Sequence, residues 1–363
     1  MNRLQPVANF LIVLVLGAVV LKEGAFILVP LVWGIFFAFA LYPISSWLEK
    51  RRIPRGLAIS LSILMVSLVA LGILYLLLNQ MIGLIKEVPE IGENLENKLS
   101  RYLEELSSLM GNDLIDPESG WDIYSLLPSG NLNETLFTTG KSLILVGIIP
   151  LYTFLLMYYK DFFVEFLIRL SSKNQGIVIN WAQESGRIIQ SYLAGMIRVT
   201  GIVAVLAGIF FYLIGVKYFV LFAAFIAIMN LIPYVGVFIS SIFAILYVFL
   251  TTVSLFYPIV TFGVLWGIQL LENNIITPLV VGSKVKVNAL AVIIAILLGG
   301  WLWGISGMVL FIPLTGILKI TLERSAGLKP FAYLLGDEVP VSEESENFWK
   351  LATRKYFKKE KPG

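Results

Sequence analysis

The sequence predicts an all-α polytopic membrane protein, because its composition is too apolar for a soluble globule and its apolar runs approach the length of a membrane span. Of the 363 residues, 58% are hydrophobic and 14% are charged. Soluble domains are typically about 45–50% apolar and about 25% charged. A membrane helix needs roughly 20 apolar residues. We expect about six full spans plus two re-entrant or broken helical hairpins, or alternatively eight spans.

Residues 1–80 are expected to form three membrane helices. Apolar runs cover residues 7–21, 25–42 and 57–78. A second apolar run follows the first at once, so we interpret both as membrane helices in a tight pair rather than as a signal peptide. The short loop at residues 49–55 carries four Lys or Arg residues. Short basic loops stay in the cytoplasm, which places this loop inside the cell.

Residues 81–140 form a polar, mostly acidic insert that we place on the extracytoplasmic side. Its first half has apolar residues every three or four positions, which predicts a helix. That helix either lies on its neighbours or forms a seam between subunits, because such a rhythm also suits coiled packing. Residues 111–133 are expected to form an irregular loop. The rhythmic positions are Val88, Ile91, Leu95, Leu99, Tyr102, Leu106 and Leu109.

Residues 141–217 return to the membrane, and residues 321–363 form a tail that ends in basic residues. We expect spans near residues 141–159 and 194–214, separated by a cytoplasmic segment whose amphipathic start suits the membrane surface. The basic tail belongs inside. Both termini are therefore expected in the cytoplasm, with the chain in the inner, or plasma, membrane.

Residues 218–320 are expected to form the core, because Pro, Gly and Asn interrupt this apolar region three times. The interruptions cover residues 229–236, 271–278 and 311–316. Backbone that leaves a helix within a bilayer survives only when it is buried in protein or lines a watery cavity. Secondary transporters often build their binding sites from such broken helices. We expect residues 218–250 and 288–320 to form the two hairpins, with a span between them. The arms of the second hairpin are expected at residues 288–298 and 305–320, around the segment 299–304.

Glu272 is the most informative single residue of this region, since it follows a long apolar run. A carboxylate within a membrane segment costs about 2.5–3.5 kcal/mol on insertion scales and commonly marks function. The functional interpretation is a proton or cation site. The alternative is a carboxylate at a helix end, wetted at the interface and paired with Lys284.

The other candidate site residues flank the breaks. Proline removes a backbone donor, glycine permits sharp turns, and the amides can satisfy freed backbone groups or a substrate. The plain alternative is a set of helix kinks with capping Asn residues. The candidates beside Glu272 are Asn230, Pro233, Tyr234, Gly236, Gln269, Asn273, Asn274, Pro278 and Pro313.

The sequence has no Cys and no His, and it has no Walker loop, dinucleotide fingerprint or nucleophile elbow. We therefore expect no enzyme, no cofactor, no metal site and no nucleic-acid partner. Any coupling ion would be H⁺ or Na⁺. The expected partners are the lipid bilayer, a small-molecule or cation substrate, and further copies of the chain.

The motifs of the core resemble those of the autoinducer-2 exporter-like permease family. They are the segment from Asn230 to Gly236, then Glu272-Asn273-Asn274 leading to Pro278 and Gly282, then Gly304-x-x-Gly307 before Pro313. The resemblance extends over most of the chain. It implies a bacterial or archaeal inner-membrane protein that forms homo-oligomers. Some members resemble exporters of autoinducer-2, and others resemble sodium or potassium/proton antiporters.

Three functional hypotheses follow from these observations. The first is a carrier that exports a small polar metabolite or signal, by alternating access around Pro233 and Pro278. The second is a cation/proton antiporter that uses Glu272. The third is a non-transporting membrane scaffold, organised by the helix at residues 88–109.

Overall fold

The structure is a computed structural model that describes residues 4–110, 147–170, 175–233, 235–252, 254–280, 287–325 and 327–337. Within these ranges every regular element is a helix, and the one β contact is an isolated bridge between Val287 and Gly336. Five helical segments of the described residues are long and apolar enough to cross a membrane. They are Ala25–Lys50, Arg55–Glu87, Gln175–Leu213, Phe256–Val280 and Ala289–Glu323. The prediction of an all-α polytopic membrane protein is therefore confirmed.

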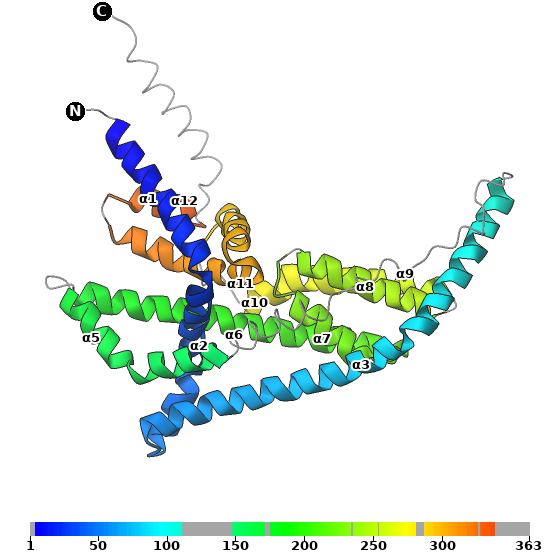
Figure 1. Ribbon diagram of the computed structural model, residues 1–363, viewed down its shortest axis with the longest axis horizontal. Helices are drawn as coiled ribbons and strands as arrows, with labels where there is room; N and C mark the ends of the chain where they lie inside the picture. Colours follow the sequence, from blue (N-terminus) through cyan, green and yellow to red (C-terminus); the bar gives the residue numbers. More distant parts are fainter. Residues whose placement is uncertain are drawn as a thin grey trace, which may run out of the picture.

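The first two helices run on from one another instead of folding back as the predicted tight pair. α1 (Leu4–Glu23) leads into α2 (Ala25–Lys50) through Gly24, as Figure 1 shows. The Gly24 N–H donates to the Val20 carbonyl at 2.9 Å, and the Leu28 N–H donates to the Gly24 carbonyl at 2.9 Å. The helical hydrogen-bond ladder is thus nearly unbroken across Gly24. The polar Lys22-Glu23 step suggested a turn, but these bonds continue the helix.

α3 (Arg55–Met110) joins the predicted third span to the first half of the acidic insert in one helix of 56 residues. At about 1.5 Å per residue its length greatly exceeds the thickness of a bilayer. Its far end projects away from the other helices (Figure 1). The predicted loop at residues 111–133 lies outside the described residues. So do the side chains that would form the seam at residues 88–109, although the backbone there is helical.

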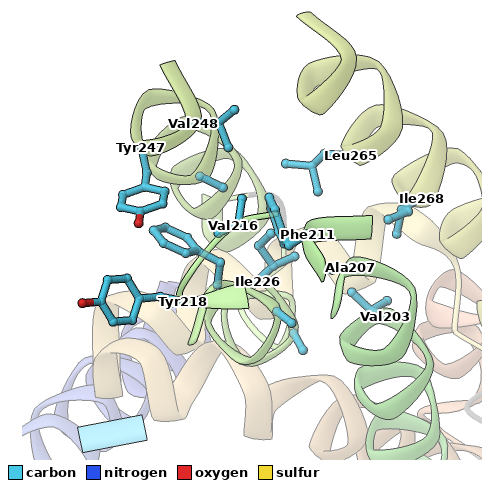
Figure 2. Packing of buried hydrophobic residues seen from close by; sticks show 14 of the residues in the cluster. Val203, Ala207, Phe211, Val216, Tyr218, Ile226, Tyr247, Val248, Leu265 and Ile268 are labelled. Carbon is cyan, nitrogen blue, oxygen red and sulfur yellow. The ribbon is translucent and has the colours of Figure 1, made fainter. Parts of the chain in front are cut away.

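α6 (Gln175–Leu213) is the central helix and packs against α2 and against elements of the C-terminal half. It follows the helix Gly147–Tyr158 and α5 (Lys160–Leu170). Val199, Val203, Ala207 and Phe211 recur every four residues and are all buried in one apolar cluster (Figure 2). This spacing places them on one face of α6, which packs against the next two helices.

The first predicted hairpin is present as α7 (Phe219–Met229) and α8 (Val235–Thr251). The two helices lie antiparallel, since the ring of Phe222 contacts that of Tyr247, with centroids 4.5 Å apart. A Cβ on Gly236 would lie 1.8 Å from the Met229 carbonyl oxygen, so only glycine fits at the tip. With 11 residues, α7 is too short to span a bilayer.

The second predicted break is a widened helical turn and not an interruption of the helix. α9 (Phe256–Leu271) continues through the π-helix η2 (Glu272–Ile276) into α10 (Thr277–Val280). The Asn274 side-chain amide donates to the Leu270 carbonyl at 2.8 Å, which satisfies a backbone acceptor within the widened turn. The chain therefore remains helical up to and beyond Pro278. π-bulges of this kind are frequent at functional sites.

The second predicted hairpin lies within α11 (Ala289–Glu323), and its turn falls within residues 299–304, the segment around which the two arms were expected. Trp303 and Gly304 have non-helical backbone, and Gly304 has φ 58° and ψ −141°. Beyond this turn the chain folds back, so that the backbones of Gly299 and Gly307 are in contact. Pro313 is buried within the second arm of α11. The interruption expected at residues 311–316 is therefore wrong, whereas the turn expected at residues 299–304 is present.

Candidate functional site

A cavity of about 510 Å³ lies where the two hairpins meet the π-helix. The first hairpin contributes its tip and one side of α8. α9 and η2 contribute a second wall, and both arms of α11 contribute a third. The lining residues are Asn230, Pro233, Val237, Phe238, Ser241, Ile245, Phe262, Leu265, Trp266, Gln269, Glu272, Asn273, Val292, Ile296 and Ile312.

The irregular backbone places the polar side chains on this cavity. Asn230 is the C-cap of α7, where the chain turns toward Pro233. Gln269 lies in the last turn of α9, while Glu272 and Asn273 open the π-helix. Each polar group therefore sits where a regular apolar helix ends or widens. Such places are the ones where a membrane protein tolerates polar groups around a water-filled space.

Glu272 is held by two donors from its own helical segment. The carboxylate is 7% exposed. Gln269 Nε2 donates to Oε2 at 2.8 Å, and Thr277 Oγ1 donates to Oε1. Within the described part of the chain Glu272 forms no ion pair, and Lys284, its predicted alternative partner, lies outside that part. The carboxylate is thus satisfied by two neutral donors of its own helical segment.

Two further amides on the cavity are free to bind a ligand. Among the described residues, neither the Asn230 nor the Asn273 side chain has a hydrogen-bond partner. Among the described residues of the lining there is no Lys or Arg, and Glu272 is the one ionisable side chain. Amide groups and a carboxylate beside aromatic rings suit a neutral polar molecule or a cation.

Five of the ten predicted site residues line this cavity, namely Asn230, Pro233, Gln269, Glu272 and Asn273. Four others lie outside the lining. Gly236 supports the close packing of the hairpin tip, Asn274 bonds to the Leu270 carbonyl, Pro278 is exposed in α10, and Pro313 is buried in α11. Tyr234 lies outside the described residues.

Sequence reasoning missed the apolar wall of the cavity and one donor to Glu272. Phe238, Phe262 and Trp266 line the cavity, yet in the sequence they resemble any lipid-facing ring. Thr277 could not be singled out in the sequence, because most hydroxyl groups of membrane helices bond to their own helix backbone. It donates to the Glu272 carboxylate instead, because the π-helix brings the residue five positions later onto the same side.

Comparison with known proteins supports a role in transport. The sequence model of the family described as AI-2E family transporter matches residues 9–327 of this chain. YhhT of Escherichia coli K12 is 27% identical over 329 residues, covering 89% of this chain and 91% of the relative. YrrI of Bacillus subtilis is 27% identical over 308 residues, covering 81% and 85%. The AI-2 transport protein TqsA of E. coli K12 is 26% identical over 339 residues, covering 90% and 95%.

The match extends over both hairpins, the π-helix and the cavity between them. All of these elements fall within residues 9–327. The same residues also include the five helical segments that are long enough to cross a membrane. This membrane protein therefore belongs to the AI-2E transporter family.

Proposed function

We propose that the protein is a secondary transporter that exports a small polar metabolite or signal similar to autoinducer-2, by alternating access. One observation carries this proposal: two hairpins and a π-helix, far apart in the sequence, bring Asn230, Gln269, Glu272 and Asn273 onto one cavity. The amides would bind substrate hydroxyl groups, and the aromatic wall would bind its apolar surface.

The name of one relative and the composition of the cavity support this choice of substrate. TqsA is named an AI-2 transport protein. The described lining has no cationic side chain, so it favours neutral polar molecules over anions such as phosphorylated sugars. The protein would act in the plasma membrane as a homo-oligomer, with both termini in the cytoplasm.

The moving parts would be the two hairpins, and α6 would be the fixed frame. The second arm of α11 is fastened to α6 by hydrogen bonds from Trp181 to Thr321, at 2.9 Å, and from Tyr192 to the Val309 carbonyl, at 3.1 Å. The first arm lines the cavity and joins the second at Gly304, whose backbone only glycine readily adopts. Movement at Gly304 and at the Pro233 turn would open the cavity to alternate sides.

Transport of labelled autoinducer-2 in proteoliposomes tests the proposal. Vesicles that contain the protein should accumulate the label above empty vesicles, and Asn230→Ala should reduce accumulation about tenfold. Asn180→Ala is the matched control, because Asn180 is an exposed amide of α6 that does not line the cavity. Equal accumulation in empty vesicles would reject this substrate.

Cation/proton antiport is the second candidate, favoured by the burial of Glu272 without an ion-pair partner in the described ranges. A pH-sensitive dye in everted vesicles would report sodium- or potassium-driven proton movement. Glu272→Gln should abolish that signal, whereas Glu165→Gln, an exposed carboxylate on α5 paired with Arg169, should leave it unchanged. A full signal in Glu272→Gln would eliminate this mechanism.

A further inference from the structure

The turn between α2 and α3 gathers positive charge from two stretches that are separate in the sequence, residues 50–55 and Lys160. Lys50, Arg51 and Arg52 form the turn itself, and Arg55 begins α3. Arg55 donates to the Asp161 carboxylate at 2.5 Å and to the Met157 carbonyl at 2.7 Å. These two bonds bring the segment at residues 157–161 against the turn.

Most of this charge is not neutralised by the protein. With Lys160 the cluster holds five cations, against two carboxylates, Glu49 and Asp161. Asp161 pairs with Arg55. Among the described residues, none of the other four cations forms an ion pair, and Glu49 accepts a hydrogen bond from Ser45. A net charge of about +3 therefore remains on a small surface, which is enough to attract anionic headgroups.

Two aromatic side chains mark the depth of these cations in the bilayer. The Arg51 guanidinium lies over the Trp47 ring, 4.0 Å from its centroid, and the Lys160 ammonium lies over the Tyr42 ring at 4.5 Å. Both rings are exposed, Trp47 by 52% and Tyr42 by 41%. Trp and Tyr concentrate at the headgroup level of membranes, so the two cations that stack on them lie at the same level.

The neighbouring α5 is suited to the same membrane depth. It follows Tyr159 directly and exposes Phe162 by 66% and Phe166 by 54%. Its polar residues include the exposed pair Glu165–Arg169. An amphipathic helix with exposed rings lies in the interface, with its apolar face among the acyl chains.

We propose that Lys50, Arg51, Arg52 and Lys160 form a binding site for the phosphate-bearing headgroup of an anionic phospholipid. The four cations would bind the phosphate, and Trp47 and Tyr42 would fix the depth of the site in the bilayer. The apolar face of α5 would lie among the acyl chains. The Arg52 backbone, with φ 67°, keeps the turn tight enough to hold three consecutive cations together. Binding would fasten α2, α3 and α5 to one leaflet, away from the transport cavity.

Thermal unfolding of the purified, delipidated full-length protein in neutral detergent tests this site. Phosphatidylglycerol should raise the unfolding midpoint by at least about 2 °C more than phosphatidylcholine at equal concentration. The triple variant Lys50→Gln, Arg51→Gln, Arg52→Gln should lose most of that difference, and Lys160→Gln alone should lose part of it. Raising the salt concentration should weaken the effect in the wild-type protein, because these charges are exposed.

The matched control removes three exposed cations elsewhere, as Lys86→Gln, Arg187→Gln and Lys329→Gln, and should retain the full lipid effect. Equal effects of the two lipids on the wild-type protein would overturn the proposal. So would retention of the effect in the triple variant, or its loss in the control. If inorganic phosphate reproduces the shift, the site binds free phosphate and the lipid proposal fails.

Discussion

Pro313 illustrates how single residues make broken helices stable in a membrane. A proline has no N–H, so it leaves the carbonyl four residues earlier without its helical donor. That carbonyl belongs to Val309, and it accepts instead from the Tyr192 hydroxyl on α6, at 3.1 Å. Tyr192 is buried, so water does not compete for this bond. The pair thus joins the second arm of α11 to α6 without leaving a backbone group unsatisfied.

A double-mutant cycle tests this pairing. Tyr192→Phe should lower the free energy of unfolding by about 1–3 kcal/mol, because the Val309 carbonyl loses its donor in a buried place. In a Pro313→Ala background the new backbone N–H can donate to that carbonyl, so the same change should cost less than about 0.5 kcal/mol. Denaturant titration in detergent measures both values. Tyr212→Phe, whose ring is 66% exposed, is the control, and equal costs in the two backgrounds would contradict the pairing.

Thr277 should matter for transport because its hydroxyl donates to the Glu272 carboxylate. Thr277→Val keeps the shape of the side chain and removes that donor, and a hydrogen bond to a charged group contributes about 1.5–3 kcal/mol. Transport by the cavity should therefore fall about tenfold, measured as initial rates in proteoliposomes. Thr251→Val is the control, since Thr251 bonds only to the Tyr247 carbonyl of its own helix. Equal rates for the two variants would show that this bond does not serve transport.

Among the helical elements, the first hairpin depends on the close contact at its tip. An ideal Cβ on Gly236 would lie 1.8 Å from the Met229 carbonyl oxygen, whereas a Cβ on Gly263 of α9 meets nothing within 4 Å. Gly236→Ala should therefore displace α7 from α8 and reduce transport severely. Gly263→Ala should be neutral or stabilise the protein by up to about 1 kcal/mol, since Ala favours helix. Thermal unfolding measures the change in stability, and initial rates in proteoliposomes measure transport. Normal transport by Gly236→Ala would show that the hairpin tip can accommodate the extra methyl group.

The sequence predicted the hairpins and their turns, but it also predicted an interruption at Pro313 that the structure does not contain. Pro233 and Gly236 lie at a real turn, where α7 has ended and α8 begins. Pro313 looked equally disruptive, yet Tyr192, distant in the sequence, compensates for it. The actual turn at Gly304, with φ 58°, lies within the segment 299–304 around which the hairpin was expected, although the sequence could not show which of its three glycines turns the chain. Whether a proline breaks a helix therefore depends on hydrogen bonds from residues distant in the sequence, which the local sequence does not show.

The sequence predicted the polar residues of the candidate site but not the apolar wall of the cavity. Asn230, Gln269, Glu272 and Asn273 stand out because polar groups are costly in apolar segments. Phe262 and Trp266 could not be singled out, because a ring that lines a cavity and a ring that faces lipid have the same local pattern. The two kinds of ring can be told apart only in the folded protein, where α8, α9 and α11 come together around the cavity.

At the scale of the whole molecule, alternating access requires that one cavity be reached from both sides of the membrane. The chain has no cysteine, so a single introduced cysteine would be the only thiol that the reagent can label. Ser241 lines the cavity, while its neighbour Ser240 is fully buried and bonds to the Val237 carbonyl at 3.2 Å. Ser241→Cys should therefore react with a membrane-impermeant thiol reagent added to either side, and Ser240→Cys should react from neither.

The same experiment also tests whether the substrate binds in the cavity. A molecule that occupies the cavity covers Ser241, so autoinducer-2 should slow the labelling of Ser241→Cys from both sides in proportion to its occupancy. Labelling can be followed by the gel shift of a thiol-reactive polymer on oriented membrane vesicles, with denatured protein as the measure of complete reaction. Reaction of Ser241→Cys from one side alone would indicate a cavity with a single opening. In that case the hairpins would not exchange access, and the cavity would not be the path of export.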